Sequence, residues 1–456
     1  MLFSNLDFWI FFAVLYLVAL FFSCLKATQS KVKSVVLVGS LTFYALGDAA
    51  NFWVLIWIKL LCFFAGKFIA ETPGLKTRRQ KILLGLTSFL AIGTLAFFKY
   101  SVDSSTTDYT MPLGISFFTF QALSYVIDVY RGRAQKADSI HDYMVYVTFF
   151  PQLIAGPIER FGQLYPQINN IRVCSLSEMK IPFLLISMAF FKKLFVADSI
   201  GPTVQLIFHS DDSRALEFLL GGWAMAMQVY FDFSAYSDFA VGLGLLFGVK
   251  LTQNFRPIWF AMNPLEFWER WNVTTGRWFR DYLLIPLGGN GTSRLQSARN
   301  MIIMFLAIGL WHGASWNWLL WGLFQGLIVA AYRDIKKHTN WADITPHFVG
   351  FLFLQFFLLP VSGLLHITSS KAIMERIEHA TLSGAYSLFD LSGIKILGPH
   401  LMFYLIPAIL LDFLSEKLEF EKLEWRHVAV IAAVCLGFAA FLQKGFKQTS
   451  FIYFGF

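Results

Sequence analysis

Charged residues are scarce in this sequence. Of its 456 residues, 14% are Asp, Glu, Lys or Arg and 56% are hydrophobic. An ordinary soluble domain has about 25% charged residues, and a soluble fold of this length has too little interior to bury so much apolar surface. The composition therefore excludes a soluble multidomain protein, a disordered chain and a coiled coil. It predicts that lipid surrounds most of the chain.

Cysteine is also rare, and it is not clustered. Cys24, Cys62, Cys174 and Cys435 form no CxxC pair and have no metal-ligand spacing, so we expect no metal site. A net charge of +8 would suggest nucleic-acid binding in a soluble protein, but no stripe of Lys and Arg is present to bind it. The basic residues stand at the ends of apolar runs, as expected of cytoplasmic loops in a membrane protein.

Long apolar runs are abundant. A membrane-spanning helix needs about 20 apolar residues, and the clear candidates are 5–25, 50–70, 81–99, 216–233, 301–320, 347–366, 398–415 and 427–442. Shorter or interrupted runs lie at 34–47, 111–129, 143–159, 181–208, 236–249 and 318–333. These runs predict an all-α polytopic membrane protein with roughly ten to twelve spans and some re-entrant or interfacial helices. No internal repeat or soluble domain is visible, so we expect one membrane domain over residues 1–456, with a polar loop near 367–397.

The charges between the first runs indicate an orientation. Two basic loops, at 26–33 and 76–81, alternate with turns that carry Asp48 and Asp103. The positive-inside rule therefore predicts an extracytoplasmic N-terminus and two cytoplasmic basic loops.

Two carboxylates interrupt an apolar run. The segment QVYFDFSAYSD (228–238) contains Asp232, Tyr236 and Asp238. Acidic side chains at membrane depth are costly unless they face a cavity, a partner or the bundle interior. They could line a substrate site, or they could pair with a nearby Arg and lock helices together; from the residues alone the structural interpretation is favoured.

The segment 254–290 combines aromatic and charged residues. Pro257 and Pro264 exclude a simple spanning helix. The mixture that follows is typical of an interfacial helix or of the wall of a wet cavity. Its candidate site residues are Trp268, Asn272, Arg277 and Arg280.

His312 lies in the apolar sequence MFLAIGLWHGASWNWLLWGLF, beside Trp311. A neutral His accepts and returns a proton near physiological pH and is rare in membrane helices without a function. Ser315 and Trp316 follow one turn later and could line the same pocket. A buried His that bridges two helices is the structural alternative, and the residues alone do not separate the two.

Several stretches together resemble one family. They are PLGISFFTFQALSYVIDVYRG (112–132), FFPQLIAGPIER (149–160), YFDFSAYSDFAVGLG (230–244), the block 254–290, LWHGASWNWLLWGLFQG (310–326) and FIYFGF (451–456). In this order they resemble the membrane-bound O-acyltransferase (MBOAT) family, in the bacterial branch of alginate O-acetyltransferases and teichoic acid D-alanyl transfer proteins. The motif-bearing core covers about 111–330.

The resemblance implies a ring of tilted helices around a central tunnel and an enzyme of the bacterial inner membrane. It implies that His312 is the family's invariant histidine, acting as a general base. The donor would be acetyl-CoA or another acyl thioester, no metal would be needed, and the acceptor would be a hydroxyl of a cell-surface polysaccharide. An extracytoplasmic partner acyltransferase is also implied.

One position departs from the family pattern. Bacterial relatives carry a second histidine in a sequence like WRRWHISLS, whereas this chain has Asn272 in WERWNVTTG. Asn is neither an acid nor a base at neutral pH, but its amide can donate a hydrogen bond to a developing oxyanion. Family members that acylate proteins or lipids often have Asn or Asp there, so the substitution is compatible with activity.

Two other functions stay open at this point. The same fold could acylate a lipid, peptidoglycan or a protein. Broken helices with buried acids also mark secondary transporters and flippases, although such proteins often contain inverted repeats.

Overall fold

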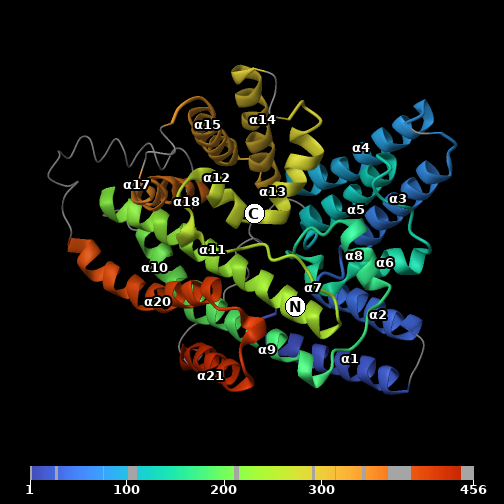
Figure 1. Ribbon diagram of the computed structural model, residues 1–456, viewed down its shortest axis with the longest axis horizontal. Coiled ribbons are helices and arrows are strands. Elements are labelled where there is room, and N and C mark those ends of the chain that lie inside the picture. The colour runs from blue at the N-terminus through green and yellow to red at the C-terminus, as the bar shows by residue number, and fades with distance from the viewer. Residues whose placement is uncertain are drawn as a thin grey trace. The chain divides into compact units, whose positions relative to one another are not determined.

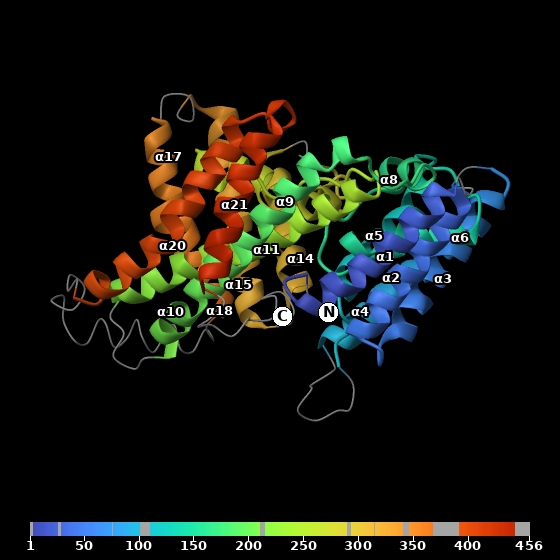
Figure 2. The same ribbon diagram turned by 90° about the horizontal axis from the view of Figure 1, so that it is seen from below.

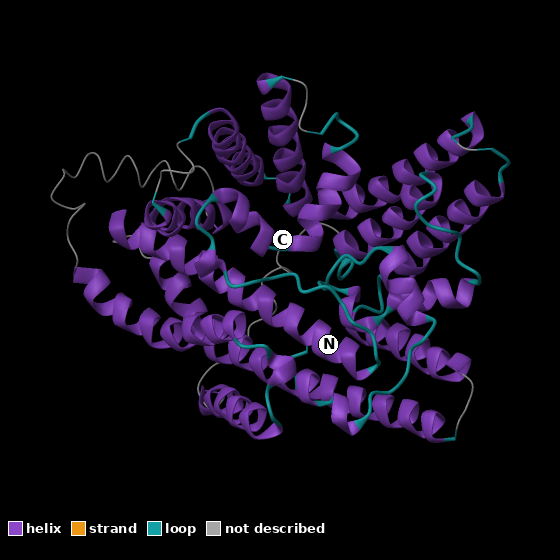
Figure 3. Ribbon diagram, viewed as in Figure 1, coloured by secondary structure: helices purple, strands orange, loops and turns teal. Residues whose placement is uncertain are grey.

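The computed structural model describes residues 3–25, 29–74, 76–100, 110–209, 215–289, 293–313, 315–340, 346–367 and 392–442. These residues form helices joined by loops and include no strand, as Figure 3 shows. The expected all-α class is therefore confirmed. By its internal contacts the chain divides into two compact units, unit 1 (Met1–Ile186 and Tyr236–Gln253) and unit 2 (Ser187–Ala235 and Asn254–Phe456).

Unit 1 consists of four long helices followed by shorter ones. They are α1 (Leu6–Cys24), α2 (Gln29–Gly47), α3 (Phe52–Glu71), α4 (Arg78–Tyr100), α5 (Ile115–Tyr130), α6 (Ile140–Thr148), α7 (Phe150–Leu153), α8 (Phe161–Ile168) and the 3₁₀ turn η1 (Leu176–Glu178). Helix α9 (Lys180–Phe190) begins in this unit, and the C-terminal part of α11 (Ala215–Leu246) belongs to it. Helices α1 and α2 lie side by side (Figure 2).

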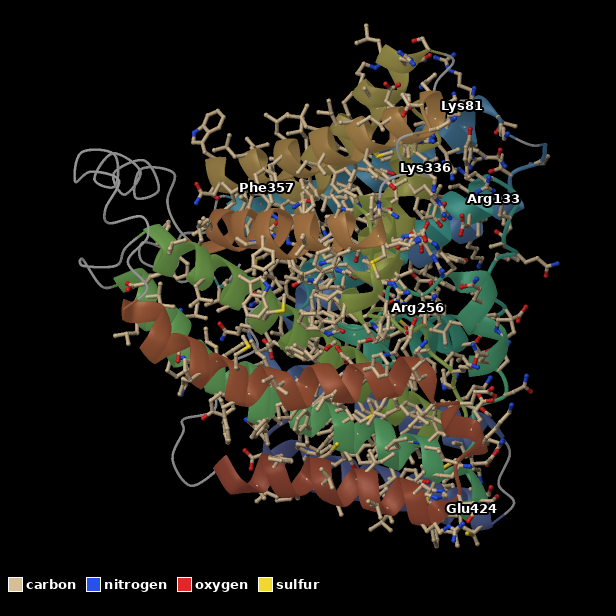
Figure 4. The ribbon with its side chains drawn as sticks, turned by 60° about the vertical axis from the view of Figure 1, so that its left-hand side comes forward. Lys81, Arg133, Arg256, Lys336, Phe357 and Glu424 are labelled. Carbon is tan, nitrogen blue, oxygen red and sulfur yellow. The ribbon has the colours of Figure 1, made fainter. Side chains whose placement is uncertain are left out.

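Helices α3, α4 and α5 pack against one another in unit 1. A small residue allows the α3–α5 approach, because a Cβ on Gly66 would lie 2.4 Å from Cε1 of Tyr125. Lys81, near the start of α4, and Arg133, just after α5, are labelled in Figure 4 and lie toward the same side of that view.

Unit 2 holds the rest of the helices (Figure 1). They are the π-helical η2 (Phe191–Ala197), α10 (Asp198–His209), the N-terminal part of α11, η3 (Ile258–Phe260), α12 (Pro264–Arg270), α13 (Val273–Phe279), η4 (Arg280–Leu284), α14 (Arg294–His312), α15 (Trp316–His338), α17 (His347–Phe353), η5 (Leu354–Leu358), α18 (Leu359–Ile367), α20 (Ser392–Lys417), η7 (Phe420–Lys422) and α21 (Trp425–Leu442).

Within the described part of the chain, five helices are long and apolar enough to cross a membrane. They are Leu6–Cys24, Phe52–Glu71, Arg78–Tyr100, His347–Leu365 and Gly398–Lys417. Each coincides with a run predicted as a span, and the first exposes large apolar side chains such as Leu6 and Leu17. The chain is a multi-pass membrane protein. Most of the expected loop at 367–397 and the motif at 451–456 lie outside the described residues.

The expected span at 301–320 is wrong. Helix α14 ends at His312, and α15 begins at Trp316 with Ser315 as its N-cap. Hydropathy does not detect this break because the residues on both sides are apolar. The run at 143–159 is also divided, since α6 ends at Thr148 and a separate short helix follows.

Helices α14 and α15 form a tight hairpin. A Cβ on Gly309 would lie 2.2 Å from the carbonyl oxygen of Trp318, and one on Gly322 would lie 2.5 Å from that of Phe305. Small residues let helix backbones approach closely in membranes. The hairpin thereby places the end of α14 against the start of α15.

Candidate active site

A cavity in unit 2 brings His312 and Asn272 together. Its other lining residues are Met225, Ala226, Val229, Asp232, Phe233, Phe267, Trp268, Trp271, Trp318, Trp321, Gln325, Leu359, Ser362 and Gly363. The cavity has a volume of about 60 Å³, which is room for a few water molecules. Its walls come from α11, α12, α14, α15 and α18, and they are mostly aromatic and aliphatic.

His312 is held by aromatic contacts at the end of α14. Its ring stacks on Trp318, with centroids 4.7 Å apart and an interplanar angle of 17°, and it meets the Trp321 ring at 5.2 Å and 77°. Gly313 makes room for this arrangement, since a Cβ there would lie 2.4 Å from Cδ1 of Trp318. The break between the two helices thus presents the imidazole to the cavity with a fixed orientation.

Asn272 sits in the kink between α12 and α13. Its backbone is left-handed, with φ of 40°, a conformation that Asn adopts more readily than most residues. Its Oδ1 accepts a hydrogen bond of 2.9 Å from Oγ1 of Thr275. The kink is fixed from outside, because Oδ1 of Asn254 accepts hydrogen bonds from the backbone N–H and the hydroxyl of Thr274. The part of the Asn272 side chain that remains available to a ligand is therefore its N–H donor group.

Trp268 provides a second N–H group. Its ring packs edge-on against Phe305 and Trp321, and its indole Nε1 is buried without a hydrogen-bond partner within the described part of the chain. Buried donors are usually paired. An unpaired indole N–H at a cavity wall is therefore suited to a polar group of a ligand.

Asp232 reaches the cavity wall from α11 and belongs to a buried ionic group. Nζ of Lys193 lies 2.9 Å from Oδ1 of Asp232 and 2.9 Å from Oδ1 of Asp198. All three side chains are at most 7% exposed. Asp232 thus pairs with a buried cation, as the structural interpretation of this residue expected, but the cation is Lys193 rather than an Arg.

The adjacent Lys192 makes a second buried pair. Its Nζ lies 3.4 Å from Oδ1 of Asp412 on α20, whose Oδ2 also accepts hydrogen bonds from the Tyr230 hydroxyl and the Trp259 indole. Both lysines lie on the π-helical segment η2. Short π-helical segments are frequent at functional sites. Lys192 and Lys193 were not singled out from the sequence, although two lysines within the apolar run 181–208 are an unusual feature.

The structure does not bring the other predicted residues to this cavity. They are Trp311, Ser315, Trp316, Tyr236, Asp238, Arg277 and Arg280. Trp311 is buried beside His312, with ring centroids 4.9 Å apart, whereas Trp316, the first residue of α15, is 75% exposed. Arg280 is exposed and pairs with Asp281. Tyr236 and Asp238 belong to unit 1, where Tyr236 stacks on Phe3 and Asp238 accepts a hydrogen bond from Gln253.

The side chains that line the cavity include groups able to transfer a proton and to bind an oxyanion, set among mostly apolar neighbours. The cavity combines an imidazole, two N–H groups and a carboxylate held by a lysine. A search of the described residues for clusters of His, Cys, Asp and Glu that could hold a metal ion finds none.

Comparison with known proteins identifies the family of this chain. The model of the membrane-bound O-acyltransferase family matches residues 133–357. The chain is also 31% identical over 460 residues to a probable alginate O-acetylase of Pseudomonas putida, covering 92% of this chain and 93% of the relative. The chain belongs to the MBOAT family. It is therefore an acyltransferase, and the resemblance seen in the sequence motifs is confirmed.

Other MBOAT relatives differ in what they are named for. A peptidoglycan O-acetyltransferase of Helicobacter pylori is 33% identical over 343 residues, which is 66% of this chain and 64% of the relative. A teichoic acid D-alanyltransferase of Bacillus subtilis is 25% identical over 274 residues, which is 54% of this chain and 68% of the relative. The part matched by the family model contains His312, Asn272, Trp268 and Gln325.

Proposed function

We propose that this MBOAT enzyme transfers an acetyl group from a cytoplasmic thioester donor, such as acetyl-CoA, to a hydroxyl of a cell-surface polysaccharide. The observation that carries the proposal is that His312 and Asn272 line one cavity walled by aromatic side chains. The relative named for O-acetylation of alginate supports the reaction class and the acceptor class, and the relative named for peptidoglycan supports the reaction class. Membership of an acyltransferase family weighs against the transporter alternative.

In this proposal His312 takes the proton of the acceptor hydroxyl as its oxygen attacks the thioester carbonyl carbon. A new C–O bond forms, the C–S bond breaks, and the proton passes from the imidazole to the leaving thiolate. A positioned base contributes about 10²–10⁴-fold to such a step. The stacking on Trp318 holds the ring in place, and the aromatic walls keep water from hydrolysing the donor.

The amide N–H of Asn272 stabilises the oxyanion that forms when the hydroxyl attacks. The hydrogen bond from Thr275 engages Oδ1 and leaves the N–H side of the amide to donate to a ligand. An oriented donor of this kind is worth about 10²–10³ in rate. Asn therefore takes over the hydrogen-bonding part of the role that a second histidine has in other bacterial members.

One feature favours acetyl over D-alanyl as the transferred group. A D-alanyl thioester carries an ammonium group that needs a negative partner when it is desolvated. The carboxylate at this wall, Asp232, already has Lys193 as its cation.

The setting of the reaction is part of the proposal. The whole chain, 1–456, acts as one membrane domain with an extracytoplasmic N-terminus, so that the donor approaches from the side of the basic loops. An extracytoplasmic partner acyltransferase works with this enzyme in modifying the polysaccharide. Acylation of a lipid, peptidoglycan or a protein is the alternative within the family.

The test of the donor and acceptor uses the full-length enzyme in membranes. Isotope from labelled acetyl-CoA is expected to appear in polysaccharide, and unlabelled acetyl-CoA is expected to compete with it. A D-alanyl thioester that is transferred at least as fast would contradict the choice of acetyl. Label found only in lipid or peptidoglycan would assign the acceptor to the alternative.

A further inference from the structure

We propose that Gln325 is a substrate-positioning residue, whose side-chain oxygen Oε1 accepts a hydrogen bond from an N–H or O–H group of the bound donor or acceptor. This inference rests on the proposed acyl transfer in the same cavity. Gln325 lies on α15, lines the cavity and is 1% exposed.

The orientation of the Gln325 amide follows from its neighbour. The hydroxyl of Ser362 donates its one hydrogen to the carbonyl oxygen of Leu358 at 2.6 Å. Its oxygen, 2.6 Å from Nε2 of Gln325, must therefore accept from that nitrogen. A reversed amide would place its oxygen against Oγ of Ser362 and would require that hydroxyl to give up its bond to Leu358. The oxygen is therefore the atom left to face elsewhere.

Oε1 of Gln325 has no hydrogen-bond partner within the described residues. Leaving a buried acceptor unpaired destabilises a fold, and native proteins rarely do so. At a cavity wall that also holds His312 and Asn272, a substrate group is the partner that fits. The cavity then offers a complementary set: N–H donors for the carbonyl that is attacked, and an acceptor for a hydrogen-bond donor beside it.

Two substrate groups have this chemistry. The pantetheine arm of a CoA thioester carries amide N–H groups, and a sugar acceptor carries hydroxyls next to the one that reacts. The attacking hydroxyl itself is excluded, because its single hydrogen goes to His312. Both sources are separable by assays with and without acceptor.

The chain provides a matched control, Gln355. It is also a buried glutamine of unit 2, but it does not line the cavity, and its Oε1 accepts a hydrogen bond of 3.1 Å from the indole of Trp223. Replacing Gln355 leaves the Trp223 N–H without its acceptor. Replacing Gln325 removes an unpaired oxygen, and Ser362 keeps its hydrogen bond to Leu358. The two glutamines should therefore differ when each is replaced by methionine, which has a similar shape and no polar oxygen.

The experiment measures acetyl transfer and acceptor-free hydrolysis of acetyl-CoA by purified full-length enzyme, together with its thermal midpoint. Gln325→Met is expected to lower kcat/KM roughly tenfold while the midpoint stays equal or rises. Gln355→Met is expected to lower the midpoint and to keep kcat/KM per folded enzyme within twofold. Loss of hydrolysis as well as transfer assigns the contact to the donor; loss of transfer alone assigns it to the acceptor.

Ser362→Ala is the second variant, in case Gln325→Met does not fold. It frees the amide to rotate and should lower kcat/KM in the same direction by a smaller factor. His312-dependent transfer by the wild type, combined with kcat/KM within twofold of wild type in both variants, would overturn this inference alone. Absence of transfer by the wild type would overturn the proposed function and this inference with it.

Discussion

Asn272 combines a left-handed backbone with a side chain whose oxygen is already engaged. The φ of 40° bends the chain between α12 and α13, and Thr275 holds Oδ1. Such backbone conformations cost free energy, and they persist where the surrounding structure fixes them. The position is therefore built for hydrogen bonding rather than for proton transfer.

Replacing this side chain separates the two roles. We expect Asn272→Ala to reduce turnover about 10²–10³-fold, because one oriented donor to the oxyanion is lost while the base remains. Asn272→His should be tolerated at least as well as Ala, because an imidazole still donates one hydrogen bond. The measurement is turnover at saturating donor and matched folded protein. Values within twofold of wild type for both variants would remove Asn272 from the site.

At the scale of elements, η2 connects three helices through buried charges. Lys193 pairs with Asp198 and Asp232, and Lys192 pairs with Asp412 on α20. Removing one partner of a buried ion pair is costly because the other charge stays buried without compensation. The segment η2 thus connects Asp232 on the cavity wall with helices α10 and α20 of unit 2.

Lys193→Met should accordingly destabilise the protein by about 3–5 kcal/mol, since it leaves the Asp198 and Asp232 carboxylates without their shared cation. We expect Lys193→Met/Asp232→Asn to recover part of the loss, because one of the two charges is then gone. The thermal midpoint in detergent reports both effects. Lys336→Met, on the exposed end of α15, is the control and should leave the midpoint within error. If the double variant is less stable than Lys193→Met, the ion pair with Asp232 is not the reason that Lys193 stabilises the protein.

Hydropathy predicts some elements of this fold and not others. It gives α1, α3 and α4 nearly to the residue, since a lipid-facing helix is apolar along its whole length. It misses the break after His312, because Gly313 and Ser315 lie between two apolar helices and change the local conformation without changing the mean hydropathy.

The site is predictable only where one residue type carries the chemistry. His312 and Asp232 were candidates because they interrupt apolar sequence, and Trp268 and Asn272 because they lie in a mixed aromatic and charged segment that resembles a family motif. All four line one cavity. Gln325 was not found, because its role depends on a hydrogen bond to Ser362 on another helix. The lysines of η2 depend likewise on carboxylates far away in the sequence.

For the whole molecule, the side from which the donor enters depends on the orientation of unit 1 in the membrane. The segment between α3 and α4 carries Lys76, Arg78, Arg79 and Lys81. Positive loops remain cytoplasmic. Because α4 is long and apolar enough to cross a membrane, the segment after it should lie outside.

Cysteine labelling tests this orientation. In a background without the four native cysteines, of which Cys24 is exposed, single cysteines placed in 101–110 should react with an impermeant reagent added to intact cells. Cysteines placed in 72–81 should react only after the cells are opened. The reverse pattern would place the donor on the other side.

The central claim is that His312 is the base for acyl transfer in this cavity, and the most direct measurement is the turnover of His312→Ala and His312→Gln. Gln keeps a planar polar side chain that can stack on Trp318 but does not accept a proton at neutral pH. His400, which contacts Thr203 and does not line the cavity, provides the control His400→Ala. At equal folded protein we predict a loss of about 10²–10⁴-fold for both His312 variants and near wild-type turnover for the control. More than half of wild-type turnover in either His312 variant would contradict the account.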